Sequence, residues 1–170
     1  MRDNVKLGFA SSIANEALWT ISLQCRRLRT NEPEDGKFAM RFWVDIQFLI
    51  VALRRFRKAI EIARSVPNLT LEIAAALKRF NDAIPDLDKM RNVGEHIDDY
   101  AWDNPARHRK DVTRRDIQVG TWNPDTGEFL WLGSSLNIDF AVKAAEELFF
   151  TYRKAIKAKG YVAKRADVIN

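Results

Sequence analysis

The chain has 170 residues, of which 46% are hydrophobic and 30% charged, and it contains five Trp and ten Phe. This size and composition exclude a largely disordered chain and suffice for a domain with a substantial core. We expect a single domain over residues 1–170, because no low-complexity or Pro/Gly-rich stretch divides the chain. The net charge of +5 and a pI near 9.5 favour an anionic partner, whether nucleic acid or an acidic protein.

The cellular compartment is indicated by the single cysteine and by the lack of a signal-peptide or membrane-span pattern in the sequence. Cys25 is the only cysteine, which excludes an internal disulfide and suits a reducing compartment. We expect it to be a small buried hydrophobe on a helix. Asn15 and Glu16 interrupt the first apolar stretch, which argues against a signal peptide. The most apolar segment, 42–53, is too short to span a membrane, so we expect a cytoplasmic protein with no membrane association.

Helical spacing of apolar residues predicts the first three elements. The first helix, up to about Arg29, should bury Leu7, Ala10, Ala14, Ala17, Ile21 and Leu28. The second, from about Gly36 to Arg64, should be buried on more than one side, through Phe42, Trp43, Ile46, Phe48, Leu49, Ile50, Val51, Leu53, Phe56 and Ile60. These two are expected to form an antiparallel hairpin. A third helix, ending at Pro85, should bury Leu69, Ile73, Leu77, Phe80 and Ile84.

The second half of the chain predicts two more helices and one hairpin. Pro85 suits the first turn of a fourth helix that continues to about Trp102. Residues 117–132 predict a β-hairpin, an insertion at about 116–133, whose turn is closed by Gly127. Phe129 and Trp131 alternate with Leu130 and Leu132, so one face of the hairpin should pack on the helices. The last helix should begin with Asp139 as its cap, run to about Lys159 and bury Ala141, Ala145, Leu148, Tyr152 and Ile156. The predicted fold class is therefore mainly α, a bundle of about five helices with one β-hairpin inserted before the C-terminal helix.

The fourth predicted helix has a polar face that contains one of the two histidines of the chain. At about 100° of rotation per residue, one side of the helix, roughly 140° wide, holds Arg91, Asn92, Glu95, His96 and Asp99. The opposite, apolar side holds Met90, Val93, Ile97, Tyr100 and Ala101. Gly94 costs about 1 kcal/mol relative to Ala inside a helix, so we expect another helix or a substrate to approach the backbone closely there.

An arginine and a histidine on one face are the minimum groups for cleaving a phosphodiester without a metal. Histidine titrates near neutral pH and can exchange a proton with the ribose 2′-hydroxyl or the leaving oxygen, while arginine keeps its charge and binds phosphate oxygens. Asn92, one turn before His96, could orient the imidazole or hold the phosphate. The alternative is that these residues are only the solvated face of an amphipathic helix, with Arg91 and Glu95 as an ordinary ion pair.

The string of Arg91 and Asn92, three further residues and then His96 resembles the motif of the HEPN superfamily, the higher eukaryotes and prokaryotes nucleotide-binding domains. The predicted helical bundle is similar to that family as well. The resemblance implies a metal-independent endoribonuclease, in a family rich in toxins and defence effectors, that uses no cofactor and works as a homodimer whose two motifs line one cleft. It implies that Arg91 and His96 are catalytic, with Asn92 as their polar companion. Glu95 and Asp99, on the same predicted helix face, are candidate supporting residues. Attack of the 2′-hydroxyl on the adjacent phosphate would then leave a cyclic phosphate end.

Two features depart from the simple family pattern. The β-hairpin is an addition to a bare helical bundle, and Asp98, Asp99 and Asp103 put negative charge where RNA would lie unless Arg or Lys pairs with them. Some HEPN members are not nucleases. The alternative function is therefore a non-catalytic helical module that binds a nucleotide or a protein partner such as an antitoxin.

The remaining motifs concern RNA binding and metals. One loop is rich in basic residues and contains Arg107, His108, Arg109, Lys110, Arg114 and Arg115. It is either a patch that binds the phosphates of RNA or a run of charged residues that is only solvated. His96, Asp99 and Asp103 lack a second well-placed histidine and any cysteine, so no metal site is predicted. The sequence contains no GxGxxG, Walker loop or nucleophile elbow and so gives no support for ATP-dependent or α/β-hydrolase chemistry.

Overall fold

The computed structural model describes residues 2–30, 32, 37–38, 40–67, 69–101 and 109–161. Within these ranges the chain forms seven helices and three strands, in the order α1 (Asp3–Arg29), α2 (Arg41–Arg64), α3 (Thr70–Ala83), α4 (Leu87–Glu95), α5 (Ile97–Ala101), α6 (Arg114–Gln118), β1 (Gly120–Asn123), β2 (Glu128–Trp131), β3 (Ser134–Asn137) and α7 (Ile138–Ala158). The predicted fold class, mainly α with a β insertion before the C-terminal helix, is confirmed. None of the helices in these ranges is both long and apolar enough to cross a membrane.

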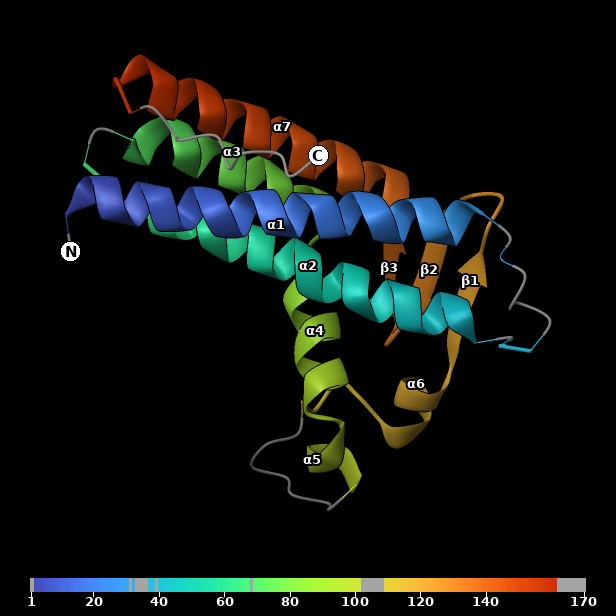
Figure 1. Ribbon diagram of the computed structural model, residues 1–170. Coiled ribbons are helices and arrows are strands. Elements are labelled where there is room, and N and C mark those ends of the chain that lie inside the picture. Colours follow the sequence, from blue (N-terminus) through green and yellow to red (C-terminus); the bar gives the residue numbers. More distant parts are fainter. Residues whose placement is uncertain are drawn as a thin grey trace.

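Four long helices, α1, α2, α3 and α7, form a bundle (Figure 1). Helix α1 packs along α2, and α3 packs along α7, which also contacts α1 and α2. Ion pairs from Arg27 to Asp45 (2.9 Å) and from Arg55 to Glu16 (3.2 Å) show that α1 and α2 run antiparallel, as predicted. Every residue expected to be buried on the first, third and last helices is at most 7% exposed, because the helical spacing places each on the face toward its neighbours.

Helix α2 departs from its prediction at two points. It begins at Arg41, and the expected start at Gly36 lies outside the described residues. Its apolar surface is wider than the faces that neighbouring elements cover, so Val44 and Phe48 remain 51% and 56% exposed. The expectation that Phe48 is buried is therefore wrong.

The three strands form one antiparallel sheet in the order β1-β2-β3. Phe129 and Trp131 are 0% and 2% exposed and Leu130 is 48% exposed, so the prediction that one face of the hairpin packs inward is confirmed. The third strand was not predicted. It follows a reversal in which Leu132 and Gly133 both have positive φ, 57° and 70°, as in a two-residue hairpin turn that matches the twist of the strands.

Two further corrections come from local hydrogen bonds. Ile117 was expected in a strand but lies in α6, which starts with a capping box in which Thr113 and Asp116 each accept from the other's backbone N–H. Asp139 was expected to cap the last helix, but Asn137 does so, since its Oδ1 accepts from the N–H groups of Asp139 (3.0 Å) and Phe140 (3.1 Å).

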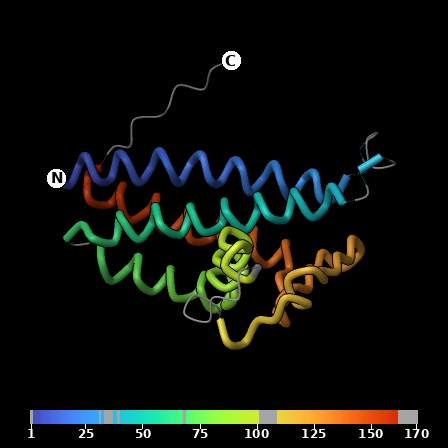
Figure 2. The backbone as a smooth tube through the Cα atoms, turned by 90° about the horizontal axis from the view of Figure 1, so that it is seen from below, coloured from blue at the N-terminus to red at the C-terminus, as the bar shows by residue number. Residues whose placement is uncertain are grey.

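The fourth predicted helix is divided into two. Helix α4 runs away from the bundle, so that it points downward in Figure 1 and is seen nearly end-on in Figure 2. It ends at Glu95, because His96 has φ −120° and ψ 38°, outside the helical region, and α5 begins at Ile97. Gly94 weakens the last turn, and Asp98 and Asp99 favour a new helix N-terminus, which explains the break.

Candidate functional site

Helix α4 is fixed to α2 by a group of charged residues near its start. Asp88 accepts hydrogen bonds from Arg57 at 2.6 and 2.7 Å and from Arg54 at 3.1 Å. Burial raises the pKa of Asp88, but the hydrogen bonds and charges of Arg57 and Arg54 outweigh this effect and hold the pKa below its usual value. Lys89 also pairs with Asp111 at 3.2 Å. Arg54 and Arg57 of α2 thus hold the start of the motif helix in place.

Gly94 brings the other end of α4 against α2 and the sheet. A Cβ atom on this residue would lie 2.8 Å from Gln47 Oε1 and 3.5 Å from Trp131 Cη2. Any larger side chain would therefore displace the flexible end of Gln47, and its Cβ would lie in ordinary contact with Trp131. The expected close approach of another helix to Gly94 is confirmed.

Arg91 is held by two residues of its own helix. Its guanidinium contacts Glu95 Oε2 at 2.5 Å and donates to Asn92 Oδ1 at 3.1 Å. The Arg91 side chain is 24% exposed, so it remains accessible from solvent. The ion pair of Arg91 with Glu95, which the sequence left as an alternative interpretation, is thus present.

His96 is exposed at the break between α4 and α5. In the part of the chain that the structure describes, its side chain has no hydrogen-bond or ion-pair partner, and the amide oxygen of Asn92 contacts Arg91 instead. The break also ends the shared helical face, so Asp99 belongs to α5 and Ile97, expected on the apolar side, is 54% exposed. The structure therefore places Arg91, Asn92 and Glu95 in one contact group and His96 just beyond it.

A hollow of about 360 Å³ lies beside this group, between α2, α4 and β2. Its lining consists of Trp43, Val44, Gln47, Phe48, Val51, Arg91, Gly94, Glu95, Ile97 and Trp131. The sequence did not associate the α2 residues or Trp131 with the motif. The expected close approach at Gly94 was the available signal, but only the fold identifies the residues that approach it.

The basic loop is only partly described, since Arg107 and His108 lie outside the described residues, as does the acidic Asp103 before it. Arg109 donates to both oxygens of Asp111, at 3.0 and 3.2 Å, and these bonds lower the pKa of Asp111 to about 2. Arg114 donates from Nε to the backbone oxygen of Tyr100 at 2.9 Å. Arg109 and Arg114 therefore have structural contacts, while Lys110 and Arg115 are exposed.

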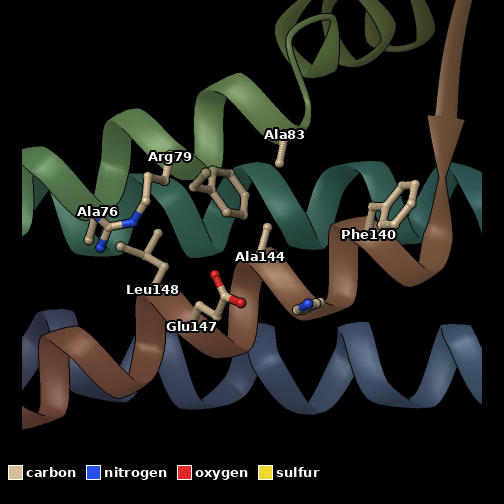
Figure 3. A pocket seen from close by; sticks show the side chains of 9 residues that line it. Ala76, Arg79, Ala83, Phe140, Ala144, Glu147 and Leu148 are labelled. Atoms are coloured by element: carbon tan, nitrogen blue, oxygen red, sulfur yellow. The ribbon is translucent and has the colours of Figure 1, made fainter.

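Two other hollows lie apart from the motif. Arg115 lines one of about 500 Å³ beside the sheet. The other, of about 300 Å³, lies between α3 and α7, where Figure 3 shows Arg79 and Glu147 facing it from opposite helices and Phe140 at its side. Its lining includes Phe80 and Leu148, which the sequence predicted as core residues, but none of the candidate site residues.

No group of three or more His, Cys, Asp or Glu side chains in the described ranges is arranged to hold a metal ion. Comparisons with protein-family models, with curated proteins and with solved structures found no match.

Proposed function

We propose that this protein is a metal-independent endoribonuclease of HEPN type. The observation that carries the proposal is the accessible group at the end of α4, where Arg91 and Asn92 are hydrogen-bonded and His96 follows one turn later. The hydrogen bond to Asn92 orients the Arg91 guanidinium before a phosphate arrives, which lowers the entropic cost of binding. The adjacent hollow gives an attached nucleoside a place to lie.

The proposed reaction is an internal transesterification. The 2′-oxygen bonds to the adjacent phosphorus, the bond from phosphorus to the 5′-oxygen breaks, and the products are a 2′,3′-cyclic phosphate and a 5′-hydroxyl. One imidazole accepts the proton of the 2′-hydroxyl, and a protonated imidazole donates to the leaving 5′-oxygen. Arg91 stabilises the negative charge that develops on the phosphate oxygens.

A dimer suits this chemistry, because each chain offers His96 alone at the motif whereas the reaction uses both an acid and a base. We expect two copies to associate near α4, so that the motifs face one cleft. Light scattering at tens of micromolar, a range that captures ordinary stable dimers, should show the dimer mass. A monomer at that concentration would contradict this part of the proposal.

The decisive experiment is incubation of the purified protein with varied RNAs in EDTA. Wild-type protein should cleave, and His96→Ala and Arg91→Ala should each lower the rate by about 10²-fold or more. Arg64→Ala removes an exposed arginine at the end of α2 and is the matched control that should retain the rate. Absence of EDTA-resistant cleavage by the wild-type protein, or variants that cleave at its rate, would refute the proposal.

A second candidate function is a non-catalytic module that binds a protein partner, such as an antitoxin, through the same end of α4. The ion pair of Arg91 with Glu95 favours it, since an arginine already neutralised by a carboxylate binds phosphate less strongly. Under this function the wild-type protein would lack ribonuclease activity, and Arg91→Ala would weaken a protein complex instead.

A further inference from the structure

The hollow between α2, α4 and β2 has aromatic walls that are already fixed in place. Trp131 donates its Nε1–H to the backbone oxygen of Ile117 at 3.1 Å. Trp43 packs edge-on against it, with ring centroids 5.2 Å apart and planes at 82°. A ligand that enters the hollow therefore meets walls that need no rearrangement, which reduces the cost of binding.

The rim of the same hollow exposes apolar side chains to water. Val44 is 51% exposed, Phe48 is 56% exposed and Ile97 is 54% exposed. All three line the hollow, so an apolar ligand seated there would gain by contact with them. The hollow, of about 360 Å³, is at the lower end of the range of about 300–1,000 Å³ that is typical of small-ligand sites.

Polar groups also line the hollow. Arg91 and Glu95 line it from α4, and Gln47 lines it from α2. Among the described residues no hydrogen-bond partner is found for the side-chain amide of Gln47. An amide and a carboxylate together offer donors and acceptors of the kind that pair with the edges of nucleobases.

From these contacts we propose that the hollow is a nucleobase subsite that stacks one unpaired base of RNA against Phe48 while Arg91 binds the neighbouring phosphate. The positive guanidinium beside an apolar, aromatic hollow matches a nucleotide, which joins an anionic phosphate to a flat ring. Bases inside a duplex are covered by their neighbours, so the subsite selects single-stranded RNA, loops or ends. The inference rests on the proposed function for its choice of RNA as ligand, but its test does not depend on cleavage.

The test measures binding by fluorescence anisotropy with two single-stranded 2′-O-methyl oligonucleotides, which have no free 2′-hydroxyl and are not cleaved by the proposed reaction. One has mixed bases, and the other has the same backbone with abasic positions. Wild-type protein should bind the first about tenfold more tightly, or ~1.4 kcal/mol, as expected for a base stacked on an aromatic ring. Phe48→Ala and Phe48→Leu should lose this difference and leave binding of the abasic strand unchanged.

Phe150→Ala is the matched control, because Phe150 is 72% exposed on α7 and does not line the hollow. It should bind both strands like the wild-type protein. Equal binding of the two strands by the wild-type protein, or a Phe48 variant that keeps the difference, would overturn the subsite. Conversion of a wild-type dimer to a monomer by Phe48→Ala, with no change in base dependence, would also overturn it and would show that a second copy covers the hollow.

The outcomes separate this inference from the proposed function. Base-dependent binding without EDTA-resistant cleavage would refute the ribonuclease and leave the subsite supported. Cleavage together with equal binding of the two strands would refute the subsite and leave the ribonuclease supported.

Discussion

Replacement of Gly120 by alanine should destabilise the protein, although the same change at Gly8 should stabilise it. A Cβ atom on Gly120 would overlap the ring of Trp43, with 3.0 Å to Cη2, and would lie 3.1 Å from Phe129 Cε2. Carbon atoms in contact prefer about 3.5–4.0 Å, so the Trp43 ring or the strand must move. Trp43 packs edge-on against Phe129 and Trp131, and its displacement would disturb both contacts.

The magnitude follows from two opposing effects. Overpacking of this kind costs about 1–3 kcal/mol, whereas the more restricted unfolded chain of the alanine variant returns about 0.5–1 kcal/mol. The free energy of unfolding should therefore fall by about 1–2 kcal/mol for Gly120→Ala. A Cβ on Gly8 in α1 would meet nothing within 4 Å, so Gly8→Ala should gain about 0.5–1 kcal/mol from helix propensity alone.

Thermal unfolding followed by circular dichroism measures both variants. For a chain of this size 1 kcal/mol corresponds to about 2–4 °C in Tm, so the melting temperatures of the two variants should differ by about 3–12 °C. A Gly120→Ala variant that melts at or above the wild-type temperature would refute the packing argument. Equal destabilisation by both substitutions would show that the effect does not come from Trp43.

Three further predictions concern charge and reactivity. Asp88→Asn should lower the free energy of unfolding by about 1.5 kcal/mol at pH 7, the low end for hydrogen bonds to charged groups, because Asp88 is 47% exposed. Since the folded pKa of Asp88 lies below the ordinary 3.8, the free energies of unfolding of wild-type and variant, measured by urea denaturation, should converge as the pH falls below about 4. Cys25 is 7% exposed, and burial raises its pKa to about 11. A thiol reagent at pH 8 should therefore label the unfolded protein and leave the native protein unlabelled, and rapid labelling of the native protein would contradict this. Glu95→Gln removes the carboxylate that competes with phosphate for Arg91, so the affinity for single-stranded RNA should rise severalfold in anisotropy measurements. Weaker binding by the variant would count against phosphate recognition by Arg91.

The sequence determined the regular part of the fold because helical periodicity is a local property. Leu7, Ile73 and Leu148 each fall on an apolar face with the expected spacing, and each is buried. Cys25 followed the same rule. The sequence also predicted the inward face of the hairpin, since the alternation of Phe129, Leu130 and Trp131 has the period of a strand with one buried side. It singled out Arg91, Asn92 and His96 by residue type and spacing.

Tertiary structure decided what surrounds those residues. The sequence predicted a close approach at Gly94 but not the residues that make it. Those residues are Gln47 of α2 and Trp131 of β2, which are distant from Gly94 in the sequence. The break at His96 depends on a balance of small local energies, and periodicity alone does not report it. The exposure of Phe48 follows from which faces of α2 its neighbours leave uncovered. A pattern along one helix identifies an apolar side, but only the packing of all elements decides whether that side is buried or lines a hollow, because burial is a property of the assembled fold.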